Sequence, residues 1–153
     1  MALSRFERAA LLRNDFYAFM QSCFHELHAQ TPFLDNWHLE LLAAKLEACR
    51  RGQCRRLIIN VPPRSLKSLA ASIAFPAWLL GHQPSAQIIC ASYAQDLADT
   101  HARHCRRVMA SAAYRCQRRS NFPQNGRSKI PQFVVRGSAA FWIRWSPWSV
   151  YGV

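Results

Sequence analysis

Acidic residues are missing from the last third of this sequence. All eight Asp and Glu residues lie between Glu7 and Asp99, whereas the chain from Thr100 to its end carries ten Lys or Arg. That segment therefore holds +10 of the formal net charge of +12. A basic block without acids is typical of a patch that binds nucleic acid or another anionic surface. The same composition also fits a tail that is not a natural folded sequence.

Long apolar runs are missing as well. No stretch reaches the roughly 18 apolar residues that a membrane span requires, so we expect no membrane-embedded segment. The N-terminus has no apolar core of a secretory signal and carries Glu7 and Asp15 within its first turns. Half of the 153 residues are apolar, which is enough for the core of one ordinary domain.

Closely spaced cysteine pairs are also missing. None of the six cysteines forms a C-x-x-C pair, and Cys90 lies in an apolar run where a small buried side chain is expected. We therefore expect reduced thiols and a cytoplasmic protein. The six are Cys23, Cys49, Cys54, Cys90, Cys105 and Cys116.

Glycine is absent where a phosphate-binding loop usually has it. Residues 57–68 read LIINVPPRSLKS, an apolar β-branched run followed by two prolines and then by Lys67-Ser68 at the start of a helical pattern. The consensus G-x-x-x-x-G-K-[ST] fails, because Leu66 stands before the lysine. The layout of strand, tight loop and helix is nevertheless that of a phosphate-binding loop. A helix N-terminus offers free N–H groups, lysine adds a charge for the phosphates, and the next hydroxyl can ligate Mg²⁺.

The periodicity of apolar residues predicts helices that alternate with short strands. The predicted elements are helices over 6–29 and 37–50 with Asn36 as N-cap, a strand over Leu57–Val61, a helix from Lys67 to Gly81 interrupted at Pro76, a strand over Ala86–Ala91 and a helix over Ala94–Met109. A right-handed crossover would make the two strands parallel. We therefore predict an α/β fold, a partial P-loop NTPase with a βαβα core of a parallel sheet, preceded by N-terminal helices.

From about Phe16 to Tyr114 the chain resembles the N-terminal ATPase part of the large terminase subunit, the DNA-packaging motor of tailed phages and prophages. The residues that carry the resemblance are NWHLELLAAKLEACRRGQCRRLIINVPPRSLKSLAASIAFPAWLLGHQPSAQIICASYAQDLADTHARHCRRVM, positions 36–109. In that family the loop is commonly PPR-x-x-KS. The more specific match is FPAWLLGHQPSAQIICASYAQDLA, positions 75–98.

The resemblance implies ATP and Mg²⁺ as cofactors, with Ser68 as the Mg²⁺ ligand through the nucleotide. It implies double-stranded DNA, the small terminase subunit and the portal protein as partners of the full-length protein, no membrane, and the bacterial host cytoplasm as its location. The nucleotide-binding residues it implies are Pro63, Arg64, Ser65, Leu66, Lys67 and Ser68, with Trp37 and His38 near the adenine.

The carboxylates that ATP hydrolysis needs are missing from this pattern. An acid to hold Mg²⁺ and a glutamate to orient water normally follow a later strand, but after Lys67 the only acids are Asp96 and Asp99, both within a helical pattern. The parent family is an ATPase-nuclease, and this chain lacks the Walker B acid, the catalytic glutamate and the nuclease domain. We assign no catalytic residue, and expect a chain that is truncated or frameshifted after about residue 115.

This interpretation divides the chain into a helical segment (1–52), a partial ATPase core (53–114) and a basic, Trp-rich tail (115–153) of doubtful native structure. Within the tail, Phe133–Val135 and Phe141–Trp145 have a strand-like composition. Two other functions stay open. A non-catalytic, basic nucleic-acid-binding protein would use the arginine-rich tail, whereas a small P-loop kinase would need the acid-tipped strand that the sequence does not offer.

Overall fold

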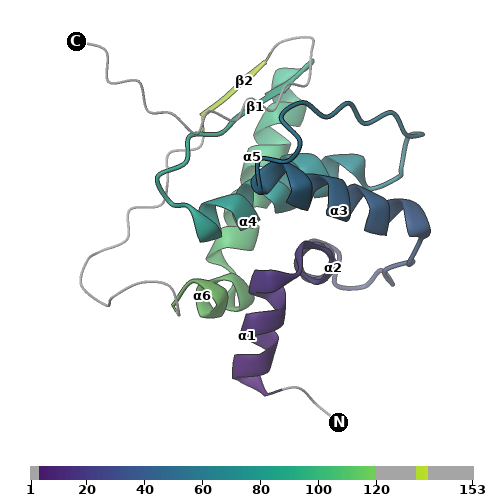
Figure 1. Cartoon of the computed structure of the whole chain (residues 1–153). Helices are drawn as coiled ribbons and strands as arrows, with labels where there is room; N and C mark the ends of the chain where they lie inside the picture. The colour runs from purple at the N-terminus through teal and green to yellow at the C-terminus, as the bar shows by residue number, and fades with distance from the viewer. Residues whose placement is uncertain (1–3, 120–133, 138–153) are drawn as a thin grey trace, which may run out of the picture.

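The structure is a computed structural model that describes residues 4–119 and 134–137. The described chain is mostly helical (Figure 1). In chain order its elements are α1 (Arg5–Asn14), α2 (Phe16–Leu27), α3 (Trp37–Arg50), the π-helix η1 (Leu69–Ala74), α4 (Phe75–His82), β1 (Ile89–Ser92), α5 (Gln95–Ala110), α6 (Ala112–Arg119) and β2 (Val134–Gly137).

The predicted parallel-sheet core of a P-loop NTPase is wrong. Residues Leu57–Val61 form no strand, and β1 covers only the second half of the strand that we predicted over Ala86–Ala91. The described chain is predominantly helical, and its strands are the two four-residue segments β1 and β2. The reason is that β-branched composition favours an extended backbone but cannot supply the neighbouring strand that makes a sheet.

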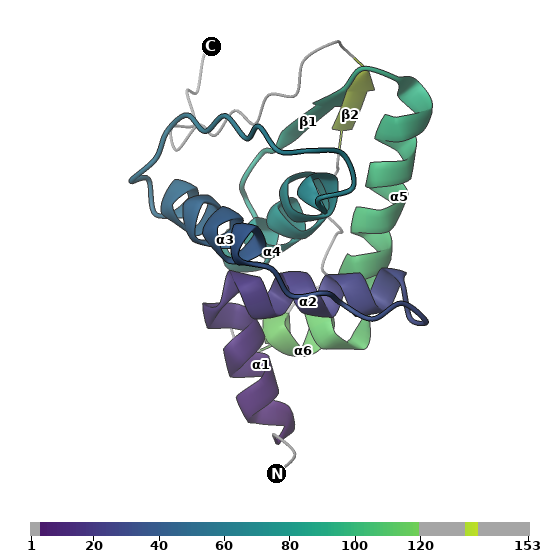
Figure 2. The same ribbon diagram turned by 90° about the vertical axis from the view of Figure 1, so that its right-hand side faces the viewer.

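The strand that pairs with β1 comes from far along the sequence. β1 and β2 are parallel, with Ile89 opposite Val134 and Ser92 opposite Gly137. β2 overlaps the first strand-like segment that the tail sequence indicated, whereas Phe133, the second segment (Phe141–Trp145) and most of the 115–153 tail lie outside the described residues. The two-stranded ribbon lies at one end of α5 (Figure 2).

The predicted N-terminal helix over 6–29 is two helices that meet at Asp15. This residue ends α1, where its N–H donates to the carbonyl oxygen of Leu11, and it caps the start of α2, where its Oδ1 accepts from the N–H groups of Tyr17 at 2.8 Å and Ala18 at 3.2 Å. An aspartate that satisfies two first-turn N–H groups strongly favours a helix start. The apolar period continues through Asp15, so periodicity alone does not reveal the break.

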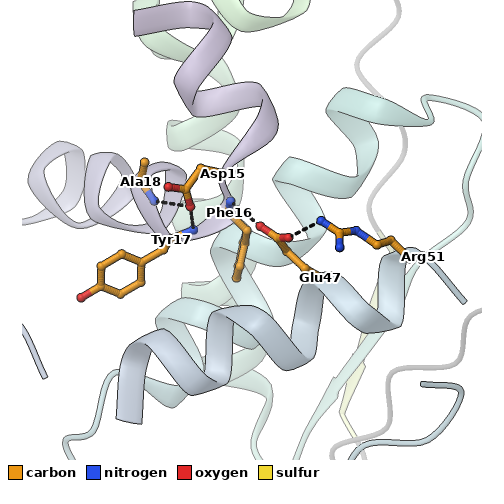
Figure 3. A network of polar contacts seen from close by, with 6 residues as sticks. All are labelled: Asp15, Phe16, Tyr17, Ala18, Glu47 and Arg51. Carbon is orange, nitrogen blue, oxygen red and sulfur yellow. Dashed lines mark hydrogen bonds and ion pairs between the residues drawn. The ribbon is translucent and has the colours of Figure 1, made fainter. Parts of the chain in front are cut away.

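Helix α3 fastens this junction to the rest of the molecule (Figure 3). Glu47 accepts a hydrogen bond from the N–H of Phe16 at 3.0 Å with one oxygen, and pairs with Arg51 at 2.8 Å with the other. Another first-turn N–H of α2 is thus satisfied from a different helix. The bounds predicted for α3 are confirmed, and its predicted apolar face is buried, although the side chain of Asn36 forms no capping bond.

The core is centred on the helix formed by η1 and α4, which the other helices surround (Figures 1 and 2). Trp78 is fully buried there, with its Nε1 donating to the carbonyl oxygen of Leu12 at 3.1 Å. Phe16 packs on its ring at 5.1 Å between centroids, and the Arg50 guanidinium lies 4.9 Å from the ring centroid. Tyr114 closes the core from α6, donating its hydroxyl to the carbonyl oxygen of Ala77.

The helix that follows the candidate loop is continuous, although Pro76 predicts an interruption. It begins at Lys67, widens into the π-helix η1 and continues as α4, where Pro76 occupies one of the first two positions. The N–H of Phe75 donates to the carbonyl oxygen of Ala70, five residues back. The proline is therefore accommodated by a local change of helix type rather than by a break. Gly81 lies inside α4, which ends one residue later.

In the described part of the chain, no helix combines the length and the apolar character needed to cross a bilayer.

Candidate functional site

The candidate phosphate-binding loop leads into the central helix. After α3 the chain runs as an extended connection past the β1–β2 ribbon and turns into the helix that starts at Lys67 (Figure 2). Figures 1 and 2 place this turn and the beginning of α3 at the same side of the molecule. The loop therefore stands at the N-terminal end of the most deeply buried helix, and is exposed at Pro62, Pro63, Arg64, Lys67 and Ser68.

Two residues of the loop adopt left-handed backbone conformations. The φ angle is 64° at Arg64 and 55° at Leu66, and these are the positive values found among the described residues other than glycine. A side chain in this region costs about 1–2 kcal/mol, which is why glycine normally occupies such positions. Leu66 holds the place directly before the lysine where the consensus has its second glycine. The sequence departs from the consensus there, but the backbone adopts the conformation that a glycine would permit.

The backbone N–H groups of the loop are available to a ligand. The first hydrogen bond of the helix runs from the N–H of Ala70 to the carbonyl oxygen of Leu66 at 2.9 Å. The N–H groups from Arg64 to Leu69 donate to no backbone acceptor in the part of the chain that the structure describes. Left-handed residues beside a helix start create an anion-binding concavity when such N–H groups point the same way.

Side-chain hydroxyls stabilise and extend this arrangement. Ser65 donates from its Oγ to the carbonyl oxygen of Pro62 at 2.7 Å, which closes the loop on itself. Ser68 already has helical backbone angles and makes no capping hydrogen bond with its side chain. Its exposed hydroxyl is therefore free to meet a ligand at the helix start. Leu66 anchors the loop, since its side chain packs against the core.

The charge around the loop is entirely positive in sequence. No acidic residue occurs between Glu47 and Asp96, whereas Arg55, Arg56, Arg64 and Lys67 are all exposed. Glu47, the acid that precedes the loop, pairs with Arg51, and no described carboxylate forms an ion pair with Arg64 or Lys67. A lysine in the first turn is unfavourably placed against the helix dipole, and an anionic ligand removes that penalty.

Trp37 and His38, the residues expected near the adenine, lie at the start of α3. The Trp37 side chain is 74% exposed and meets the His38 ring edge to face at 6.3 Å between centroids. The Nε2 atom of His38 is buried and has no hydrogen-bond partner in the described chain. The exposed Trp37 indole has a flat apolar face of the kind that can stack on a base.

Carboxylates that could help to hold Mg²⁺ are not gathered at the loop. Asp96 and Asp99 lie on α5 and line a surface hollow with Thr100, Arg103 and Arg106. Asp99 accepts a hydrogen bond from Gln95 at 2.9 Å. The described residues contain no group of three or more His, Cys, Asp or Glu side chains arranged to hold a metal ion. Ser68 alone would then contact the metal, with the remaining ligands supplied by phosphate oxygens and water.

The predicted loop residues thus meet in one place, but the conformation that makes them a candidate site was not predicted. The sequence signals were the two prolines, which stiffen the approach, and the Lys-Ser pair. No local propensity predicts a positive φ at Arg64 or Leu66, because both residue types disfavour it. Trp37 was suggested as a site residue only through the resemblance.

Comparison with known proteins adds no relative: no family model, no curated protein and no solved structure matches this chain.

Proposed function

We propose that the loop from Pro63 to Ser68 binds the phosphates of ATP, and that the chain is the N-terminal part of the large subunit of a phage or prophage terminase. In this proposal it is an ATP-binding component of the motor that packages viral DNA, acting in the bacterial host cytoplasm. The observation that carries the proposal is the left-handed backbone at Arg64 and Leu66 beside unused N–H groups.

Each part of the loop has a distinct task in this proposal. The N–H groups from Arg64 to Leu69 surround the phosphate oxygens, and Lys67 supplies a mobile positive charge to the terminal phosphates. Arg64 offers a planar guanidinium that can hold two phosphate oxygens. Ser68 contacts Mg²⁺, which neutralises the phosphates when bound. Trp37 stacks on the adenine, and His38 lies beside it.

Nucleotide binding tests the loop directly. We expect Lys67→Ala to weaken binding of Mg²⁺–ATP by at least about tenfold, since a charge-assisted phosphate contact is worth about 1.5–3 kcal/mol. Lys45→Ala is the matched control, because Lys45 is exposed on α3. Calorimetric titration of both variants is the measurement. Equal affinity of the two variants, or no binding by the unaltered chain, would overturn the proposal.

The isolated chain should bind ATP without turning it over. Hydrolysis needs a carboxylate on Mg²⁺ and a glutamate that orients water, and neither is provided near the described loop. Phosphate release should therefore equal that of the Lys67→Ala variant. A rate clearly above that variant would show that a carboxylate elsewhere in the chain reaches the site.

The exposed arginines of α5 and α6 favour nucleic acid as a partner. DNA binding is also what the alternative function, that of a non-catalytic DNA-binding protein, requires. Arg103 donates to the hydroxyl of Thr100 at 3.0 Å, and Arg107 donates to the carbonyl oxygen of Glu26 at 2.9 Å. Both acceptors are uncharged, so these bonds orient the guanidinium groups without neutralising them. Arg106 and Arg115 are exposed on the same helical pair.

Measurements of DNA binding and of ATP binding together separate the two functions. Neutralising phosphates releases counterions, so binding should weaken steeply with salt, and Arg106→Ala with Arg107→Ala should reduce the slope by about two. If DNA binds and Lys67→Ala leaves ATP binding unchanged, the alternative function is favoured. In the full-length terminase the proposed partners also include the small subunit and the portal protein.

A further inference from the structure

The turn after α3 brings two cysteines together. Gly52 has a φ of 76° and folds the chain back on the helix end, with its N–H donating to the carbonyl oxygen of Cys49 at 3.0 Å. The N–H groups of Gln53 and Cys54 then both donate to the carbonyl oxygen of Ala48, at 3.0 Å and 3.3 Å. Since Cys49 directly follows Ala48, the backbone of Cys54 lies beside that of Cys49.

The two side chains lie close to one another beside this turn. The neighbouring Cys54 thiol helps to raise the pKa of Cys49, and the Cys54 Sγ donates to the carbonyl oxygen of Arg56 at 3.3 Å. Both cysteines are half-buried, whereas the other described free cysteines, Cys23, Cys90 and Cys105, are buried. A disulfide needs two closely spaced backbones and thiols that approach one another, and this turn supplies both.

We infer that Cys49 and Cys54 are a redox pair, which a small-molecule disulfide such as oxidised glutathione converts into an intramolecular disulfide. The Cys54 thiolate attacks one sulfur of oxidised glutathione and releases one glutathione thiolate, which leaves a mixed disulfide on Cys54. Cys49 then loses its proton to solvent and attacks the Cys54 sulfur, releasing the second glutathione thiolate. Two protein thiols are oxidised by two electrons, and one glutathione disulfide is reduced to two thiols.

The packing of Cys49 against the core sets this order of attack. Burial and the neighbouring Cys54 thiol raise the pKa of Cys49 to about 11, so Cys49 is protonated at neutral pH and is the slower nucleophile. Cys49 also packs against the core, which holds it in place for the second step. The reaction is faster at alkaline pH. The pair is independent of nucleotide binding, because neither cysteine belongs to the loop from Pro63 to Ser68.

Peptide mapping tests the pair in the intact chain. The protein is equilibrated with buffers of defined reduced and oxidised glutathione, quenched with N-ethylmaleimide and digested with trypsin. Because arginines follow both cysteines, a disulfide links the peptide LEACR (Leu46–Arg50) to GQCR (Gly52–Arg55). We expect this linked species in the unaltered chain and in a Cys105→Ser control. Two maleimide adducts, or two separate glutathione adducts, would overturn the inference.

The folded turn should promote the disulfide beyond what sequence proximity gives. We expect half-oxidation at a ratio of oxidised to reduced glutathione about tenfold lower for the native chain than in guanidinium, because the native turn already holds the thiols together. Equal midpoints would overturn that role. In single variants, a glutathione adduct should form faster on Cys54 of Cys49→Ser than on Cys49 of Cys54→Ser. The opposite order would contradict the assigned attack.

Discussion

The helical side of the molecule, around η1 and α4, buries its apolar side chains more completely than the loop side, which comprises residues 57–61 and Tyr93. On the helical side, side chains from α1, α2, α3 and α5 close around the η1–α4 helix, and even the indole N–H of Trp78 has an acceptor. On the loop side, residues 57–61 are extended with no backbone hydrogen bond in the described chain, and Ile58 is 94% exposed. Tyr93, just after β1, is 79% exposed.

This difference shows which side of the described chain covers its apolar side chains and which side leaves some of them exposed. Alternate residues of the extended segment face inward, since Leu57 and Ile59 pack against the core while Ile58 does not. That is the pattern of a strand with one covered face and unpaired edges, which favours aggregation. Within the described chain, the other face of this segment, with Ile58, is left uncovered.

The largest expected loss of stability follows from a substitution on the helical side. Trp78→Ala should lower the free energy of unfolding by about 3–5 kcal/mol, because it removes a fully buried ring together with the hydrogen bond that its Nε1 donates to the carbonyl oxygen of Leu12. Trp37→Ala is the matched control on an exposed indole, and should change stability by less than about 0.5 kcal/mol. Chemical denaturation followed by circular dichroism measures both. Similar losses in the two variants would erase the distinction between the two sides.

The contact between α3 and the start of α2 should be the next in size. Glu47→Ala should cost about 1–2 kcal/mol, because the N–H of Phe16 loses its acceptor. Arg51→Ala removes the ion pair alone, and because Arg51 is half exposed it should cost less than about 0.5 kcal/mol. The same denaturation series compares them. An equal cost for both would mean that the ion pair, and not the helix-start bond, fastens the junction.

A substitution in the strained loop is expected to raise the free energy of unfolding instead of lowering it. Arg64→Gly should raise stability by about 0.5–1 kcal/mol, because glycine adopts the left-handed conformation of this exposed position without steric cost. ATP binding should weaken in the same variant, since the guanidinium is lost. Arg55→Gly is the control, because Arg55 is exposed and has no positive φ. A destabilised Arg64→Gly protein would contradict the strain assigned to the loop.

The smallest effect on stability is expected from a substitution on the loop side. Ile58→Thr should leave the free energy of unfolding within about 0.5 kcal/mol and reduce aggregation, because the side chain it replaces contacts water. Ile59→Thr, one residue on and packed against the core, should instead cost about 1–2 kcal/mol. Light scattering with denaturation tests both. Unchanged aggregation in Ile58→Thr would move the liability away from this segment.

The sequence predicted local helices well and the sheet poorly, for identifiable reasons. The bounds of α3 were predictable because leucines recur on one face and Arg51-Gly52 ends the pattern. The break at Asp15 was hidden by an uninterrupted apolar period, although a capping aspartate stood there. The partner of β1 could not be predicted, since it lies more than forty residues downstream at Val134–Gly137 and pairing is not a local property.

The sequence predicted which residues form the candidate site but not the backbone conformation that they adopt. Lys67 and Ser68 were identifiable because a Lys-Ser pair after a proline loop begins an apolar-periodic helix. The left-handed angles at Arg64 and Leu66 depend instead on the packing of Leu66 beneath the loop, a tertiary contact. The absence of a consensus glycine concealed a backbone that behaves as if one were present.

Backbone amide mapping by NMR tests the phosphate-binding loop most directly. On titration with Mg²⁺–ATP, and separately with pyrophosphate, the largest shifts should fall on the N–H groups from Arg64 to Leu69, which have no backbone acceptor in the described chain. Pyrophosphate isolates the phosphate contacts, and shifts near Trp37 should appear with ATP alone. Shifts that fall mainly on α5 and α6, or none at saturating nucleotide, would contradict phosphate binding by this loop.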